Sequence, residues 1–516
     1  MDLPRAAGVL LHISSLPGKF GTGDLGAGAR SFVDFLAEAS QSYWQVLPLG
    51  PTCGGFADSP YMSFSAFAGN PLFIDLADLV EQGFLSPRSL AEVPDFSEYL
   101  LDYERASVWR MPLLLGAWKT FRSTPPCEFK AFCQSCPWLE DYALFMALRA
   151  HHGGQPWYAW PGGLSGRQPA ALALARDQLA DMVGFHSFLQ FQFFRQWQKL
   201  REYARAADVR LIGDLPIYVG HDSADVWAHH ELFCLRAEDF QPIQVAGVPP
   251  DYFSPTGQRW GNPVYRWESA PGVANKPLYD WWAERLRAIL ELTDLCRIDH
   301  FRGFESYWAI AAEEETAVNG RWIKGPGAPF FAAMRAALGE LPFIAEDLGV
   351  ITPAVDELLR DLGLPGMKVL QFAFDGDEKN LYLPHNLTST NCVVYTGTHD
   401  NNTTLGWYLD ETTNPSVRSQ LRRYLNSDGG AISHDMVRCA MGSVASLAIA
   451  PLQDILGFGG DCRLNTPGTR QGNWRWRCAP RFLTREIAKW LREETKFYNR
   501  AGEGRNSPES QGQADG

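Results

Sequence analysis

Acidic side chains recur at the ends of short apolar runs in this chain. Asp214 closes RLIGD, Asp299 closes CRID, Glu346 and Asp347 close FIAED, and Asp400 follows VVYTGTH. Paired carboxylates can cleave a glycosidic bond, one as the nucleophile and the other as acid and then base. They can also hold a divalent cation for phosphoryl chemistry, but no Walker-type loop accompanies them. These residue types therefore favour glycoside chemistry without a metal.

The aromatic content favours the same class of ligand. The chain has 18 tryptophans and an aromatic fraction of 13%, and many of these rings lie beside Asp, Asn, Gly or Pro rather than in helical stripes. Sugars stack their C–H faces on such rings while their hydroxyls bind carboxylates and amides. Many rings must be ordinary core, yet the clusters around the acidic positions indicate a carbohydrate site.

Eight apolar or β-branched runs, each followed by a polar residue and a loop, must position these side chains. Helical patterns separate several of them, which predicts a (β/α)8 TIM barrel of the α/β class. The expected strands are 8–12, 44–48, 209–214, 295–299, 342–346, 367–372, 392–396 and 445–450. Because the active site of such a barrel forms at the C-terminal strand ends, the acidic residues should face one cleft.

Two neighbouring strands can supply the catalytic pair. Retaining glycoside cleavage needs carboxyl groups about 5–5.5 Å apart, a separation that adjacent barrel strands can provide. We therefore assign Asp299 as the nucleophile and Glu346 as the general acid/base. Arg297 lies two residues before Asp299, on the same side of its strand, and should keep that aspartate ionised. His399 and Asp400 are expected to hold hydroxyls of the sugar that is being distorted.

Two long segments interrupt the barrel pattern. The segment 50–205 far exceeds a usual βα connection and should form an inserted subdomain, and 217–275, rich in Pro, Trp, Tyr and Gly, is a candidate lid. We expect residues 1–500 to form one catalytic barrel with these insertions, and the small polar tail 501–516 to be disordered. No pattern for a C-terminal β-sandwich follows the last strand.

Charge and cysteine usage limit the partners and the location. The net charge of -13 disfavours nucleic-acid binding, and we find no signal peptide or membrane span. The ten scattered cysteines suit reduced thiols in the cytoplasm, and the one close pair, Cys133 and Cys136, lacks partners for zinc. A GxGxxG match from Gly21 lies too far from its strand for a dinucleotide site. No cofactor is expected, and nothing requires more than a monomer or weak oligomer.

Several long motifs carry a resemblance to a known family. They are LPGKFGTGDLG, DSPYMSFSAFAGNP, GDLPIYVGHDSADVW, PPDYFSPTGQRWGNPVYRW, RIDHFRGFESYW, AEDLGVITPAV, GMKVLQFAFDG, TGTHDNNTTLGWY and RLNTPGTRQGNWRWR, in this order. The chain resembles the amylomaltases, which are 4-α-glucanotransferases of glycoside hydrolase family 77 in the α-amylase clan. The match extends over nearly the whole chain.

The resemblance implies the same nucleophile and acid/base, and it adds Asp400 as the aspartate that stabilises the transition state. It also implies a set of sugar-binding residues. Around the scissile bond these are Tyr61, Asp214, Arg297, Asp347, Asp375, His399 and Asn465, and in a mobile loop over the cleft they are Tyr252, Phe253, Gln258, Trp260 and Asn262.

The reaction that the resemblance implies is a disproportionation. A segment of an α-1,4-glucan or maltooligosaccharide passes to the 4-hydroxyl of glucose or another glucan, while the lid keeps water away from the covalent intermediate. Two alternatives stay open. One is an α-1,4-glucan hydrolase of the same clan with a more open cleft, and the other is a non-catalytic glucan-binding protein that has kept the barrel.

Overall fold

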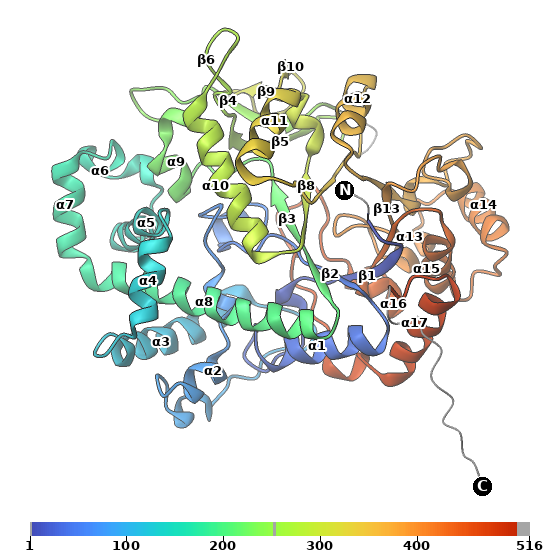
Figure 1. Cartoon of the computed structure of the whole chain (residues 1–516), viewed down its shortest axis with the longest axis horizontal. Coiled ribbons are helices and arrows are strands. Elements are labelled where there is room, and N and C mark those ends of the chain that lie inside the picture. Colours follow the sequence, from blue (N-terminus) through green and yellow to red (C-terminus); the bar gives the residue numbers. More distant parts are fainter. Residues whose placement is uncertain (1–2, 251–253, 503–516) are drawn as a thin grey trace.

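Eight parallel strands close into a barrel at the centre of the molecule. The computed structural model describes residues 3–250 and 254–502. The strands follow the order β1-β14-β13-β12-β11-β8-β3-β2 around the barrel. Their bounds are β1 (Ala6–Leu10), β2 (Tyr43–Gln45), β3 (Arg210–Pro216), β8 (Leu295–Asp299), β11 (Phe343–Ala345), β12 (Gly366–Val369), β13 (Cys392–Tyr395) and β14 (Leu447–Pro451). All eight expected strands are present, so the predicted (β/α)8 fold is confirmed (Figure 1).

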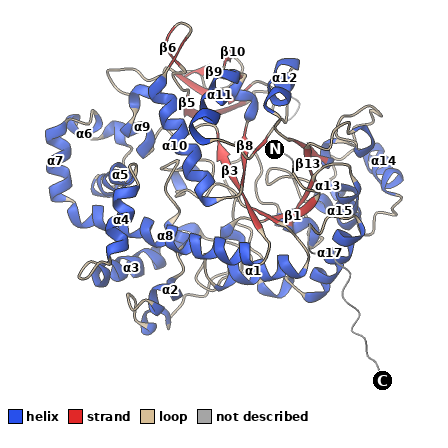
Figure 2. Cartoon of the chain, viewed as in Figure 1, coloured by secondary structure: helices blue, strands red, loops and turns tan. Residues whose placement is uncertain are grey.

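Helices surround this barrel (Figure 2). Those that follow its strands are α1 (Ala27–Glu38), α8 (Ala180–Ala206), α10 (Lys276–Leu292), α11 (Gly327–Leu338), α12 (Pro353–Leu362), α13 (Thr404–Leu409), α14 (Pro415–Leu425), α15 (Ile432–Gly442), α16 (Leu452–Ile455) and α17 (Arg485–Phe497). One connection departs from the expected strand-then-helix order. Between β12 and β13 the chain forms only two short 3-10 helices, Leu370–Phe372 and Pro384–Asn386, so this side of the barrel carries a loop.

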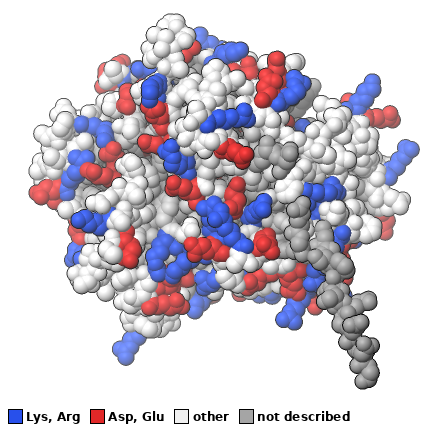
Figure 3. Space-filling view, in the orientation of Figure 1, with Lys and Arg blue, Asp and Glu red and all other residues white. Residues whose placement is uncertain are grey.

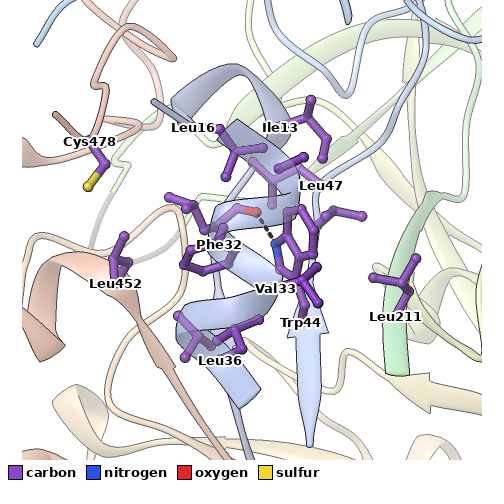
Figure 4. Close-up of a cluster of buried hydrophobic side chains, with 14 of the residues drawn as sticks. Ile13, Leu16, Phe32, Val33, Leu36, Trp44, Leu47, Leu211, Leu452 and Cys478 are labelled. Atoms are coloured by element: carbon purple, nitrogen blue, oxygen red, sulfur yellow. Dashed lines mark hydrogen bonds between the residues drawn. The ribbon is translucent and has the colours of Figure 1, made fainter. Parts of the chain in front are cut away.

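The helix α1 packs on β2 through the apolar residues that recur at helical spacing in its sequence. Phe32, Val33 and Leu36 lie on one face of α1, and all three are fully buried. Figure 4 shows these side chains around Trp44 of β2, whose indole N–H donates a 2.8 Å hydrogen bond to the Leu11 carbonyl. Burying apolar side chains at helical spacing against a strand is what fixes a barrel helix.

The insertion between β2 and β3 is helical. Before α8 it contains α2 (Leu76–Glu81), α3 (Tyr103–Phe121), α4 (Cys127–Ser135), α5 (Leu139–His151), α6 (Gly162–Ser165) and α7 (Pro169–Gln178). Buried amides of α8 hold the loop that follows β2. The Gln190 side chain accepts from the Gly69 N–H at 2.7 Å and donates to the Gly69 carbonyl at 2.9 Å. Long α8 thereby fixes a loop that reaches the cleft.

The predicted lid region forms part of a second, antiparallel sheet. Its strand order is β10-β9-β4-β5, with bounds β4 (Gln244–Val248), β5 (Gln258–Pro263), β9 (Ser306–Ala311) and β10 (Arg321–Lys324). The short helix α9 (Ala224–Ala228) and the hairpin of β6 (Glu268–Ala270) and β7 (Val273–Ala274) belong to the same insertion. The sequence pattern placed only 217–275 here, but half of the sheet comes from the segment after β8. Tyr252 and Phe253 lie outside the described residues.

The two ends of the described chain meet at the barrel. Ala501 is buried and forms an antiparallel bridge with Ala6, whereas residues 503–516 of the expected tail lie outside the described residues. Between β14 and Gly502 no further strand occurs, as the absence of a β-sandwich pattern predicted. Among the described residues no helix is both long and apolar enough to cross a membrane. Figure 3 shows basic and acidic side chains interspersed over one face.

Candidate active site

Arg297 of β8 joins two of the predicted carboxylates. Its Nη1 donates to both oxygens of Asp214, at 2.7 and 2.8 Å, and its Nη2 donates to Oδ1 of Asp299 at 2.9 Å. The strand register explains this arrangement, because β3 and β8 pair with Asp214 beside Arg297. Burial opposes the charge of the guanidinium, but its two carboxylates raise the pKa of Arg297 well above its ordinary value. The second Asp299 oxygen, Oδ2, stays outside this ion pair.

Glu346 lies beside Asp299 at the end of the neighbouring strand. The register pairs Ala345 with Ile298, and the Glu346 N–H donates to the Ile298 carbonyl at 3.0 Å. The two carboxyl oxygens of Glu346 accept from different backbone groups, Oε2 from His300 N–H at 2.7 Å and Oε1 from Leu348 N–H at 3.0 Å. The expected pair thus stands on adjacent strands, as the sequence pattern predicted.

The two carboxyls differ in their electrostatic environment. Burial raises the pKa of Glu346 to about 7, because Arg297 and two backbone N–H groups only partly offset the desolvation and Asp299 adds repulsion. Burial also raises the pKa of Asp299, but that carboxylate has Arg297 in direct contact. Of the two, Glu346 is therefore the group suited to carry a proton near neutral pH.

Asp400 is linked to the same cluster through His399 and Tyr61. Tyr61 donates to Oδ2 of Asp214 at 2.6 Å and stacks on the His399 ring, with centroids 4.9 Å apart. His399 in turn lies 3.3 Å from Oδ1 of Asp400. Burial acts to raise the pKa of Asp400, but the His399 charge and hydrogen bonds lower it to about 2. Asp400 is therefore ionised at any working pH.

Asn465, a predicted sugar ligand, forms a hydrogen bond with Asp400. Its Nδ2 donates to Oδ1 of Asp400 at 2.6 Å. Arg463, which the sequence analysis did not single out, donates from Nη2 to the Asp400 carbonyl at 2.6 Å and from Nε to the Asn465 carbonyl at 2.6 Å. Both residues belong to the motif RLNTPG. Their common partner, Asp400, lies more than sixty residues earlier in the chain, so the sequence alone does not show the contact.

The lid strand β5 places its residues in different ways. Trp260 meets the ring of His300 edge-on, with centroids 4.9 Å apart, and its indole N–H donates to the Gln258 side chain at 3.1 Å. Asn262 is buried, and its Nδ2 donates to the Val219 carbonyl at 2.8 Å. Trp260 therefore faces the residue after Asp299, whereas Asn262 anchors the strand to the loop after β3.

Two predicted sugar ligands lie away from the Arg297 cluster. Asp347 accepts from the Met367 N–H of β12 at 2.6 Å and pairs with Lys368 at 3.4 Å. Strand alternation turns it from the side that Glu346 faces. Asp375 is exposed in the loop after β12, where it accepts from Asn380 at 2.9 Å. A role in sugar binding stays a prediction for both.

No group of three or more His, Cys, Asp or Glu side chains within 3–250 and 254–502 could hold a metal ion. Three of the carboxylates at the cleft have cationic or histidine partners instead, Asp214 and Asp299 with Arg297 and Asp400 with His399. Tyr61 and Asp214 also line a cavity of about 60 Å³. The arrangement can supply a nucleophile, a proton donor and a fixed negative charge around one sugar ring.

A closed (β/α)8 barrel with carboxyl groups on adjacent strand ends defines a glycoside-active barrel enzyme. The chain belongs to the 4-alpha-glucanotransferase family, glycoside hydrolase family 77, whose sequence profile matches residues 11–484. Its activity is that of a 4-α-glucanotransferase, and glucans are its substrates. The hydrolase and binding-protein alternatives are thereby set aside.

Relatives of nearly equal length share this family. The chain is 51% identical to a 4-alpha-glucanotransferase of Thermus thermophilus, over 95% of this chain and 98% of that protein. It is 49% identical to one of a Synechocystis species, over 96% of this chain and 98% of that protein. Among solved structures, the amylomaltase of Streptococcus agalactiae in complex with acarbose superposes with a TM-score of 0.92 at 39% identity, over 96% of this chain and 100% of that one.

Proposed function

We propose that the chain transfers α-1,4-glucan segments by a retaining double displacement in which Asp299 is the nucleophile, Glu346 the acid/base and Asp400 the stabiliser of the transition state. One observation carries the proposal. The two carboxyls stand at the ends of adjacent strands, and Arg297 contacts Asp299 but not Glu346. A nucleophile must be ionised and an acid protonated, and this difference in contacts favours that distribution.

In the first step, Oδ2 of Asp299 attacks the anomeric carbon of the donor sugar. The bond from that carbon to the glycosidic oxygen breaks, and Glu346 gives its proton to the oxygen as the leaving sugar departs. The sugar at the cleft passes through a transition state with positive charge near its anomeric carbon. Asp400, ionised and held by Asn465 and His399, supplies opposite charge there.

In the second step, the 4-hydroxyl of an acceptor glucose or glucan takes the place of the leaving sugar. Glu346 accepts the hydroxyl proton, the acceptor oxygen bonds to the anomeric carbon, and the ester bond to Asp299 breaks. The product again has the α configuration because two displacements have occurred. A pKa of about 7 suits Glu346 for both tasks, giving a proton in one step and taking one in the next.

Transfer over hydrolysis requires that the acceptor sugar outcompete water. Trp260, from the lid strand β5, offers an aromatic surface beside His300 on which an acceptor ring can stack. Stacking orients the 4-hydroxyl and displaces water from the same space. Gln258, which accepts from the Trp260 indole, is proposed to complete this surface. Tyr252 and Phe253, which lie outside the described residues, are proposed as further sugar ligands on the resemblance to the family alone.

We further propose α-1,4-glucans and maltooligosaccharides as donors, and glucose or glucans as acceptors. A cytoplasmic location is supported by ten free cysteines, which suit a reducing compartment. We propose one catalytic barrel that carries both insertions and acts without a cofactor, as a monomer or weak oligomer.

The test is incubation of the purified protein with maltotriose alone, with products resolved by chain length over time. Transfer gives glucose together with a ladder of longer maltooligosaccharides, and the Asp299→Asn and Glu346→Gln variants should lose this ladder. Glucose and maltose without longer products would contradict transfer. Full activity of Asp299→Asn would contradict the assigned nucleophile.

A further inference from the structure

His300, the residue that follows Asp299, has an unusual backbone conformation. Its φ of 53° and ψ of 48° place it in the left-handed region, which few residues other than glycine adopt. Such a conformation at a buried, non-glycine position usually persists only where the surrounding structure needs it. His300 is 8% exposed and stands between the nucleophile strand and the 3-10 helix Phe301–Phe304.

This conformation occurs where two successive backbone donors face the proposed acid/base. The His300 N–H donates to Oε2 of Glu346 at 2.7 Å, the shorter of the two hydrogen bonds to that carboxyl group. An extended residue at 300 would instead continue β8, whose N–H and carbonyl groups pair with the neighbouring strands. The Phe301 N–H instead donates to the Glu346 carbonyl at 3.1 Å. The left-handed turn at His300 lies between these two successive donors and lets both N–H groups face Glu346, one its carboxyl group and the other its carbonyl.

The imidazole ring of His300 carries no charge near neutral pH. Burial, with Arg302 nearby, lowers the pKa of His300 to about 3, so the ring is neutral beside Glu346. It packs edge-on against Trp260 and lies over Gly303, where an added Cβ would approach the ring to 3.1 Å. The ring occupies this space, and the backbone makes the contact with the carboxyl.

We infer that His300 is a positioning residue for the proton transfer, and that its left-handed backbone, rather than its imidazole, holds the Glu346 carboxyl in place. The inference rests on the proposed role of Glu346. Each carboxyl oxygen has two acceptor sites, so the N–H groups of His300 and Leu348 occupy one site on each oxygen. One site per oxygen stays free to carry the proton that moves to and from the sugar.

The His300 N–H also affects the pKa of the Glu346 carboxyl. A backbone N–H favours the charged form of a carboxyl, so the His300 contact opposes the burial that raises the pKa of Glu346. The other groups that face Glu346 electrostatically are Arg297, Asp299 and the Tyr382 hydroxyl. Loss of the His300 N–H should therefore raise the pKa of Glu346 and misplace the proton donor.

The experiment compares substitutions by their tolerance of the left-handed region. Asparagine and glycine adopt it readily, whereas β-branched valine does not. His300→Val should lower kcat/KM on maltotriose roughly 10- to 100-fold, because a displaced acid costs rate steeply. The basic limb of its pH profile should move to higher pH. His300→Asn and His300→Gly should keep the limb in place, since both retain the N–H contact.

A donor that needs no acid separates positioning from a general structural defect. Fluoride ion leaves α-maltosyl fluoride without being protonated. His300→Val should therefore lose much less activity with this donor than with maltotriose. Asp208, exposed and also left-handed with φ of 55°, supplies the matched control. Asp208→Val should lower the melting temperature and leave the pH profile and the ratio between donors unchanged.

Two outcomes would overturn the inference. Equal losses on both donors with an unmoved basic limb in His300→Val would mean that the residue only supports the fold. Losses in His300→Asn and His300→Gly that match His300→Val would mean that the imidazole acts. Failure of the proposed function is seen separately, because Glu346→Gln would then keep the basic limb and the same ratio between the donors.

Discussion

At the scale of single residues, Arg297 organises the charges of the site. One guanidinium contacts Asp214 through both oxygens and Asp299 through one. A lysine in its place would offer one charged nitrogen and could not bridge two carboxylates in this fixed geometry. Glu346 on the next strand receives no such contact, and this asymmetry favours a proton on Glu346 rather than on Asp299, as the proposed roles require.

The pH dependence of the reaction should reflect this asymmetry. Glu346 must be protonated in the free enzyme, so kcat/KM should fall as the pH rises through about 7, the pKa of its buried carboxyl. On the acid side, activity should fall as Asp299 becomes protonated. The measurement is initial rates on maltotriose at low substrate from pH 4 to 9. A basic limb that persists in Glu346→Gln would show that another group controls it.

Asn465 offers a second test at this scale, because it holds Asp400 and was expected to bind sugar. Removal of its amide in Asn465→Ala takes a hydrogen bond from a carboxylate, worth about 1.5–3 kcal/mol. If Asp400 acts in the transition state, kcat should fall about 10-fold or more with little change in KM. Arg470→Ala, an exposed position in the same loop, should be neutral. A rise in KM alone would instead indicate direct sugar binding by Asn465.

At the scale of elements, the periodicity of the chain predicts the barrel but not its second sheet. Eight buried runs mark the strands, and 295–299 matches β8 at both ends. The strands β9 and β10 escaped prediction because neither is a fully buried apolar run and both lie in the connection that follows β8. The loop between β12 and β13 likewise carries no helix, which a repeating βα pattern cannot reveal.

The same limit applies to the site. Strand ends identify Asp214, Asp299 and Glu346, because the topology sends those ends to one side of the barrel. Contacts between distant loops are not visible in a single sequence, as with Asn465 and Asp400. The left-handed backbone at His300 also leaves no signal in the residue pattern, since histidine is enriched in that region yet mostly adopts other conformations.

The antiparallel sheet that contains β5 gives a prediction about the balance between transfer and hydrolysis. Trp260 on β5 is proposed to stack on the acceptor, so Trp260→Ala should reduce transfer about 10-fold and raise the share of hydrolysis, since stacking contributes about 0.5–1.5 kcal/mol beyond burial. The two products are distinguished by following reducing ends and chain lengths together. Trp322→Ala is the matched control, because Trp322 lies on β10 at the opposite edge of the sheet. Equal effects of the two variants would contradict an acceptor role for Trp260.

At the scale of the whole molecule, the barrel is closed where the two ends of the chain meet. The first strand pairs with the last, β1 with β14, along five residues from Ala6 to Leu10. Arg500 lies just beyond α17 and is fully buried there. Its guanidinium donates to the carbonyl of Ala6 at 3.0 Å and to that of Ala445 at 2.9 Å, and so holds together the N-terminal strand and the segment before β14.

This seam should control the stability of the molecule without affecting its chemistry. Arg500→Ala removes a buried cation and leaves several backbone carbonyls without their donor, including those of Met441 and Ser443. The expected loss is about 3 kcal/mol or more, because buried acceptors cannot recover these bonds from water. Thermal unfolding of Arg500→Ala should therefore begin well below that of the parent, with kcat/KM at 25 °C unchanged. Lys496→Ala, exposed on α17, provides the comparison, and equal melting temperatures for the two variants would show that the barrel closes without Arg500.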